Sequence, residues 1–148
     1  MPTVRRRRSM PASAEDVWRV VSDPERLADW WPGVARVEEA SPLAWTTVLS
    51  SARGRTVRAD YTRVEAEAPR TISWRQELAE SPFERILSES LTAVELEPEG
   101  DGATRVEVSL RQRGRGFARF GFLQLRLAAA RQVNGALDGL EAVLGRRG

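Results

Sequence analysis

The sequence contains no cysteine, no histidine and no lysine. Without cysteine there is no disulfide, no thiolate zinc site and no thiol nucleophile, and without histidine the commonest general base and metal ligand is missing. The absence of lysine excludes a Schiff base and the lysine of a phosphate-binding P-loop. Any catalysis must use carboxylates, arginine, tyrosine, serine or threonine, and we expect no metal and no cofactor.

Long apolar runs are also missing. No segment approaches the roughly 20 apolar residues that span a bilayer, and the charged N-terminal stretch has neither the apolar core nor the cleavage site of a signal peptide. We therefore expect a soluble, cytoplasmic protein. The chain has 148 residues, which suits one domain over residues 1–148 with a core of its own.

Charge is abundant but nearly balanced. All 23 basic residues are arginine, against 21 acidic residues, and the net charge is +2. Exclusive use of arginine together with abundant alanine points to a GC-rich bacterial genome. Four consecutive arginines at residues 5–8 raise the alternative of nucleic-acid binding. In a strand these side chains alternate between two faces, and acidic residues are interspersed elsewhere, so we predict no nucleic-acid partner.

The most regular pattern predicts one long helix over residues 117–144. Apolar residues at steps of three or four form a single stripe, namely Phe122, Leu125, Ala129, Val133, Ala136, Leu140 and Val143. A second row, here called the outer apolar row, lies on the side of the first half that should meet solvent; it consists of Phe117, Phe120, Leu123 and Leu127. Something must cover this row.

A third line on the same helix is made of small residues, namely Gly121, Ala128, Gly135, Gly139 and Ala142. Small side chains on a packed helix either let a neighbouring backbone approach closely or leave space for a bound molecule. The pattern favours packing and leaves both interpretations open.

The remaining chain predicts a strand, two short helices and six more strands. Ser13 caps a helix that ends at Ser22, and Asp23 with Pro24 begins a second helix that ends near Asp29. Alternating patterns separated by short turns are typical of an antiparallel sheet. The predicted strands are residues 3–10, 34–39, 45–52, 56–66, 71–78, 83–96 and 104–113.

This order of elements and four segments carry a resemblance to a known family. The segments are residues 10–18 (MPASAEDVW), 21–27 (VSDPERL), 30–34 (WWPGV) and 68–74 (APRTISW). At these residues and in the terminal helix the chain resembles the START-like (helix-grip, SRPBCC) superfamily, specifically its polyketide cyclase/dehydrase-like members. The resemblance implies an α+β helix-grip fold, in which a curved antiparallel sheet of about seven strands wraps around the long C-terminal helix. It also implies a cavity between sheet and helix for a lipid, sterol, polyketide or other apolar molecule, and it assigns no catalytic residue.

Aromatic and polar side chains supply the candidate pocket residues. Trp31, Trp45 and Trp74 offer large apolar surfaces with an N–H that can orient a ring system. The polar candidates at strand positions are Tyr61, Gln76, Glu89 and Arg111. One step of register would reverse the face of each, so a solvent-facing or paired position is the alternative. The predicted ligand-binding residues are Trp31, Trp45, Tyr61, Trp74, Gln76, Phe83, Glu89, Phe120, Phe122 and Leu125.

Three functions remain open at this point. The first is a carrier or sensor of a small apolar molecule, acting as a monomer or homodimer. The second is a polyketide cyclase/dehydrase-like enzyme, for which the available ionisable groups are Arg58, Asp60, Tyr61 and Glu89. The third is a protein-interaction or membrane-associated module that uses the outer apolar row.

Overall fold

Alternation of buried and exposed side chains produces seven strands in the computed structural model, which describes residues 3–51, 53–115 and 121–145. Apolar periodicity and capping residues produce the helical segments between and after them. In chain order the elements are β1 (Thr3–Met10), α1 (Ala14–Val21), η1 (Pro24–Arg26), α2 (Leu27–Trp30), β2 (Val34–Glu38), β3 (Ala44–Ser50), β4 (Thr56–Glu67), β5 (Thr71–Glu77), β6 (Leu87–Glu99), β7 (Ala103–Gly114) and α3 (Phe122–Gly145).

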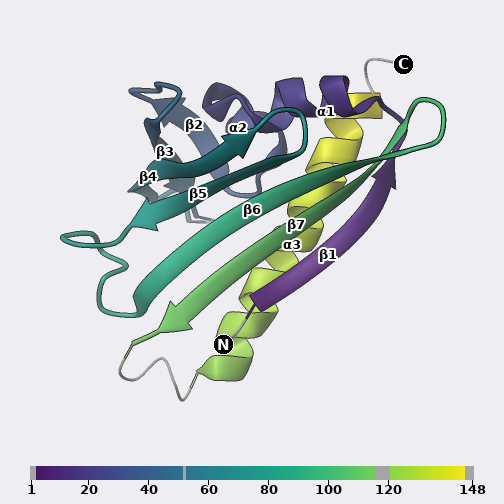
Figure 1. Ribbon diagram of the computed structural model, residues 1–148. Helices are drawn as coiled ribbons and strands as arrows, with labels where there is room; N and C mark the ends of the chain where they lie inside the picture. The colour runs from purple at the N-terminus through teal and green to yellow at the C-terminus, as the bar shows by residue number, and fades with distance from the viewer. Residues whose placement is uncertain (1–2, 52, 116–120, 146–148) are drawn as a thin grey trace.

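All seven strands form one antiparallel sheet in the order β1-β7-β6-β5-β4-β3-β2. The first strand pairs with the last, so the chain has to pass from one edge of the sheet to the other between β1 and β2. The segments α1, η1 and α2 make this passage, and the sheet curves around α3 (Figure 1). The predicted α+β helix-grip architecture is confirmed.

Two side-chain caps set the path of the crossing segment. The Ser13 side chain accepts a hydrogen bond from the Asp16 backbone N at 3.2 Å, and Asp23 accepts one from the Glu25 backbone N at 3.1 Å. Each such cap contributes about 1 kcal/mol. The second predicted helix is a 3₁₀ turn followed by a single α-helical turn ending at Trp30, and this turn packs against α3 and β2.

Small residues of α3 let α2 approach closely. A Cβ added to Gly135 would lie 2.7 Å from the Pro32 side chain, and one added to Gly139 would overlap the carbonyl oxygen of Trp30. Real Cβ atoms do not tolerate such contacts, so these two positions require glycine for close packing. Of the two interpretations of the small line, the structure supports packing at Gly135 and Gly139.

The two halves of α3 differ in burial. Its predicted stripe is buried from Ala129 onward against β1, β7 and α2, with Val133, Ala136 and Leu140 fully buried. In the first half, Leu123 and Leu127 are 71% and 59% exposed. The other members of the outer apolar row lie outside the described residues. Within the described chain, no helix is long and apolar enough to cross a bilayer.

Several predicted boundaries needed correction. The strand predicted to begin at residue 83 begins at Leu87, because Phe83 to Ile86 form a turn in which the Leu87 backbone N donates to the Phe83 carbonyl at 2.9 Å. The strand predicted to end at Glu39 stops one residue earlier, since Glu39 has φ 51°, outside the extended region. Residues 117–120, where the long helix was predicted to begin, lie outside the described residues, and α3 is described from Phe122.

Candidate functional site

A cavity of about 100 Å³ lies on the concave face of the sheet. Because α3 packs on β1 and β7, most of the cavity wall comes from strands and from the segments flanking them, and α3 contributes Gln132. The lining residues are Leu27, Trp31, Pro32, Val34, Thr47, Leu49, Tyr61, Trp74, Gln76, Phe83, Leu87, Ser90, Thr92, Leu110, Gln112 and Gln132.

Five aromatic rings form a continuous cluster beside the cavity. The ring-centroid distances are 5.5 Å for Trp30–Trp31, 6.3 Å for Trp31–Trp74, 6.0 Å for Trp74–Trp45 and 6.1 Å for Trp45–Tyr61. Three of the contacts are edge-to-face and the last is stacked. Each contributes about 0.5–1.5 kcal/mol beyond area burial. The cluster therefore gives the cavity a rigid apolar wall.

Beside this wall, and sharing Tyr61 with it, neutral polar side chains follow one another across the sheet. Tyr61 on β4 is paired with Gln76 on β5, and Ser90 on β6 is paired with Gln112 on β7. Directly opposed residues share a face, so these side chains lie on the concave side together with Thr47 of β3. We call Thr47, Tyr61, Gln76, Ser90 and Gln112 the polar row.

The polar row is electrically neutral. No Asp, Glu or Arg appears among the described lining residues. Burial raises the pKa of Tyr61 to about 12, against the lowering effect of a hydrogen bond with the Thr47 side chain. Tyr61 therefore keeps its proton at neutral pH and can donate it in a hydrogen bond.

Within the polar row, Gln76 has an unsatisfied amide. Its side chain is only 6% exposed, and its Nε2 has no hydrogen-bond partner among the described residues. By contrast, Gln112 Nε2 donates to Ser90 Oγ at 3.4 Å. A buried donor without a partner costs about 1–3 kcal/mol, so an acceptor placed in the cavity next to Gln76 would be stabilising.

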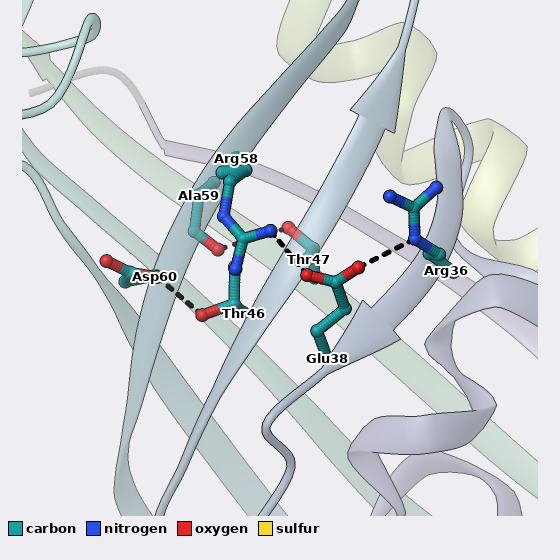
Figure 2. Close-up of polar contacts among 7 residues, drawn as sticks. All are labelled: Arg36, Glu38, Thr46, Thr47, Arg58, Ala59 and Asp60. Carbon is teal, nitrogen blue, oxygen red and sulfur yellow. Dashed lines mark hydrogen bonds and ion pairs between the residues drawn. The ribbon is translucent and has the colours of Figure 1, made fainter.

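Arg58 and Asp60 lie on the opposite, convex face (Figure 2). Glu38 accepts hydrogen bonds from Arg36 at 2.8 Å and from Arg58, while Thr46 donates to Asp60 at 2.6 Å. Hydrogen bonds from Arg36 and then Arg58 hold the pKa of the Glu38 carboxyl below its usual range. Two of the four groups considered for acid–base chemistry are therefore outside the cavity.

Glu89 also lies away from the cavity. A register irregularity between Leu87 and Glu89 on β6 leaves Ser90 on the concave side. The Glu89 carboxylate accepts a hydrogen bond from Arg111 Nε at 3.1 Å and lines a separate hollow with Arg115. The expectation that Glu89 points inward does not match this placement. Tyr61 is the one ionisable side chain among the described lining residues.

The structure brings five predicted site residues together: Trp31, Tyr61, Trp74, Gln76 and Phe83 all line the cavity. Trp45 packs behind Tyr61 and Trp74 and is 4% exposed. Leu125 is half-buried on α3, outside the lining set, and Phe120 and the side chain of Phe122 lie outside the described residues.

Sequence reasoning missed several polar lining residues, namely Thr47, Ser90, Thr92, Gln112 and Gln132. Alternation carried a usable signal for three of them. Residues two apart on a strand share a face, so Ser90 and Thr92 lie on the same face as the buried Val94, and Gln112 lies on the same face as Leu110. Among the described residues, no group of three or more acidic side chains is placed to bind a metal ion.

Comparison with known proteins gives a consistent family. The family model described as "Polyketide cyclase / dehydrase and lipid transport" matches residues 1–145. Among curated protein sequences, none matches the chain.

Solved structures share the fold at low identity. A START superfamily protein from Mycobacterium smegmatis is 14% identical with a TM-score of 0.78, covering 99% of each chain. The Zhui aromatase/cyclase from Streptomyces sp. R1128 is 20% identical with a TM-score of 0.75, covering 98% of this chain and 94% of that one. The di-domain aromatase/cyclase StfQ of the steffimycin biosynthetic pathway is 15% identical with a TM-score of 0.79, covering 99% of this chain and 51% of that one.

Proposed function

This chain belongs to the polyketide cyclase/dehydrase and lipid transport family of START-like proteins, and from that premise we propose that it binds a small, neutral, largely apolar molecule as a carrier or sensor. The binding site is the cavity on the concave face of the sheet. One observation carries the proposal, which is that an aromatic wall and a neutral polar row with an unsatisfied amide at Gln76 meet at one cavity.

The volume of the cavity limits the ligand. Its roughly 100 Å³ is comparable with an engineered cavity of about 150 Å³ that takes benzene, and it is well below the ~300–1,000 Å³ typical of drug-sized ligands. In this conformation the site suits a single-ring molecule. A polycyclic ligand would require movement of wall residues such as Phe83, which belongs to the turn before β6.

Ligand binding is tested by native mass spectrometry of the purified protein and by thermal shifts with small neutral ring compounds. A ligand at a hundredfold excess over its dissociation constant raises the free energy of unfolding by about 2.7 kcal/mol. Ser90→Leu, which fills the cavity, should abolish the shift. Ser88→Leu, on an exposed position of the same strand, is the matched control and should retain it. A protein without bound mass that no compound stabilises would contradict the proposal.

A polyketide cyclase/dehydrase-like activity is the second candidate. It is favoured by the names of the structural neighbours, two of which are aromatase/cyclases. The described lining offers Tyr61 as its one ionisable group and no carboxylate, so binding ranks above catalysis. Turnover of a polyketide-like substrate that is lost in Tyr61→Phe, while the variant still binds the substrate, would reverse this ranking.

An interaction module ranks third. The exposure of Leu123 and Leu127 favours it, because large exposed apolar side chains are common at contact surfaces. Sedimentation with liposomes and size-exclusion chromatography, each compared with the Leu123→Ser/Leu127→Ser double variant, would test this. Association that disappears in the double variant would support the module, and unchanged behaviour would exclude a role for these two leucines.

A further inference from the structure

The Gln76 side chain lies where the sheet opens. Pairing between β5 and β6 stops at Arg75 and Leu91, and one residue further along β5 comes Gln76. Gln76 lines both the concave cavity and a hollow that it shares with Glu77, Glu89 and Arg115. Because the two strands are no longer paired there, the side-chain amide of Gln76 has no hydrogen-bond partner on β6.

The neighbours of Gln76 in the polar row do not satisfy its N–H groups. Ser90, the next inward residue on β6, accepts from Gln112 Nε2 at 3.4 Å and receives no hydrogen bond from Gln76. On the other side, Tyr61 is directly opposite Gln76 in the β4–β5 register. Its hydroxyl is itself a donor, because the phenol is protonated at neutral pH. Gln76 and Tyr61 therefore bring two donors to the same cavity, the unpaired Gln76 amide and a protonated phenol whose hydroxyl also bonds with the Thr47 side chain and can turn its proton toward a ligand.

The charge of the wall decides which acceptor fits these donors. A carboxylate in the cavity would be desolvated with no cation among the described lining residues, and an unpaired buried charge is strongly disfavoured. A carbonyl oxygen accepts two hydrogen bonds, has no donor of its own to satisfy and carries no net charge. A pure hydrocarbon would leave the Gln76 amide unpaired.

We propose that Gln76 Nε2 and the Tyr61 hydroxyl bind one carbonyl oxygen of the ligand, so that the protein selects small neutral carbonyl compounds, such as ketones or lactones, over hydrocarbons and carboxylates of the same shape. The inference rests on the proposed ligand-binding function and specifies its ligand class. The aromatic cluster from Trp31 to Trp74 packs against the apolar body of the ligand, and the two donors orient its oxygen.

Three probes of nearly equal shape test this selection. They are acetophenone, α-methylstyrene, in which a CH₂ group replaces the carbonyl oxygen, and benzoate. Binding is measured by calorimetry and by quenching of the intrinsic tryptophan fluorescence, to which Trp31 and Trp74 in the cavity wall contribute. We expect acetophenone to bind about tenfold more tightly than α-methylstyrene, the difference that one or two hydrogen bonds supply, and benzoate to bind more weakly than either.

Gln76→Met removes the donor and keeps the volume, and Gln124→Met at an exposed position of α3 is the matched control. Because Gln76→Met removes an unsatisfied buried amide, it should fold with unchanged or higher stability. The variant should lose most of the preference for acetophenone over α-methylstyrene, because only Tyr61 still donates to the carbonyl, while Gln124→Met keeps the preference. The carbonyl stretch of bound acetophenone should lie at lower frequency in the unmodified protein than in Gln76→Met, with a smaller change in Tyr61→Phe.

The outcomes separate the inference from the function on which it rests. Equal binding of ketone and hydrocarbon by the unmodified protein would overturn the carbonyl selection while the ligand-binding function stands. The same conclusion follows from a preference that is undiminished in Gln76→Met, or from benzoate bound as tightly as acetophenone. Failure of all three probes to bind would overturn both.

Discussion

The two faces of the sheet differ in the side chains that the same strands place on them. On β6 and β7, Val94, Val106 and Val108 are fully buried on the concave face. The alternate residues carry charges on the convex face, where Arg105 donates to Glu99 at 2.9 Å and Glu107 pairs with Arg7 at 3.0 Å. On β6 and β7 the concave face is uncharged and the convex face carries ion pairs, whereas at the edge of the sheet Arg8 of β1 pairs with Asp138 of α3.

Each face also carries a hollow, and the comparison shows that volume alone does not identify a binding site. The convex hollow is the larger at about 530 Å³, but it is open and lined by arginine and glutamate side chains that include the Arg7–Glu107 pair. Solvated pairs of this kind contribute little and have little to gain from a ligand. The concave cavity is smaller, but it holds an unsatisfied buried amide at Gln76, which a ligand can satisfy.

The largest effect should come from placing a charge on the concave face. Thr92→Glu puts a carboxylate at a position that is 4% exposed, with no cation among the described lining residues, and should lower the free energy of unfolding by about 3 kcal/mol or more. Ala93→Glu, one residue along β6 and on the other face, should change it by less than about 0.5 kcal/mol. Urea denaturation measures both. Similar losses in the two variants would contradict the difference between the faces.

The pKa of Tyr61 reports how far the concave face excludes water, and it can be followed through the pH dependence of stability. The folded-state pKa of Tyr61 is raised from 10.0 to about 12, so its contribution to stability is fully present below pH 10 and is lost as pH rises through 12. The loss is on the order of 2 kcal/mol, and Tyr61→Phe should remove it.

The titration of Tyr61 can be read without interference, because the chain has a single tyrosine, no lysine and no cysteine. Tyrosinate absorbance at high pH should show a midpoint near 12 in the folded protein and near 10 in urea. A folded-state midpoint near 10 would mean that the phenol is in contact with bulk water.

A smaller effect is expected where α2 and α3 cover the concave face. Gly139→Ala gains about 1 kcal/mol of helix propensity, but its Cβ overlaps the Trp30 carbonyl oxygen, and the net result should be a loss of about 1–2 kcal/mol. Gly145→Ala, whose Cβ meets nothing within 4 Å, is the control and should be neutral or slightly stabilising. A stabilised Gly139→Ala protein would show that α2 moves away without cost.

The smallest effect belongs to the convex face. The pKa of Glu38 is lowered by Arg36 and Arg58, so its ion pairs stabilise the fold above the usual carboxyl pKa, and this contribution is lost as pH falls through the lowered value. Glu38→Gln should be slightly less stable than the unmodified protein at pH 7 in low salt. The difference should vanish at low pH and in about 1 M salt, as measured by urea midpoints. A stability difference between Glu38→Gln and the unmodified protein that is unchanged at low pH and in high salt would contradict the solvent exposure of these ion pairs.

Much of the fold could be predicted from the sequence because its signals are local. Capping at Ser13, alternation along β5 and the periodicity of α3 each depend on residues a few positions apart. The same alternation placed Trp74 and Gln76 on one face. Cytoplasmic location and oligomeric state stay predictions.

The errors arose where one residue changes the register. The irregularity at Leu87 and Glu89 moves Glu89 away from the cavity, and no local pattern marks it, because a one-residue shift reverses the face of each side chain. The periodicity of α3 placed Leu123 and Leu127 on the solvent side of the helix, and both are exposed. The cover expected over them is not formed by the described residues, because α3 makes its main contacts with β1, β7 and α2.

By itself the sequence determined the kind of protein, which is an antiparallel sheet around a long helix with no thiol, imidazole or amine chemistry. Only the tertiary structure decided where the site lies. The polar row joins residues from Thr47 to Gln112 across five strands, and the Gln76 amide lacks a partner because β5 and β6 separate beside it. Local periodicity sets which residues can share a face, whereas strand register and the point where pairing ends set which of them meet.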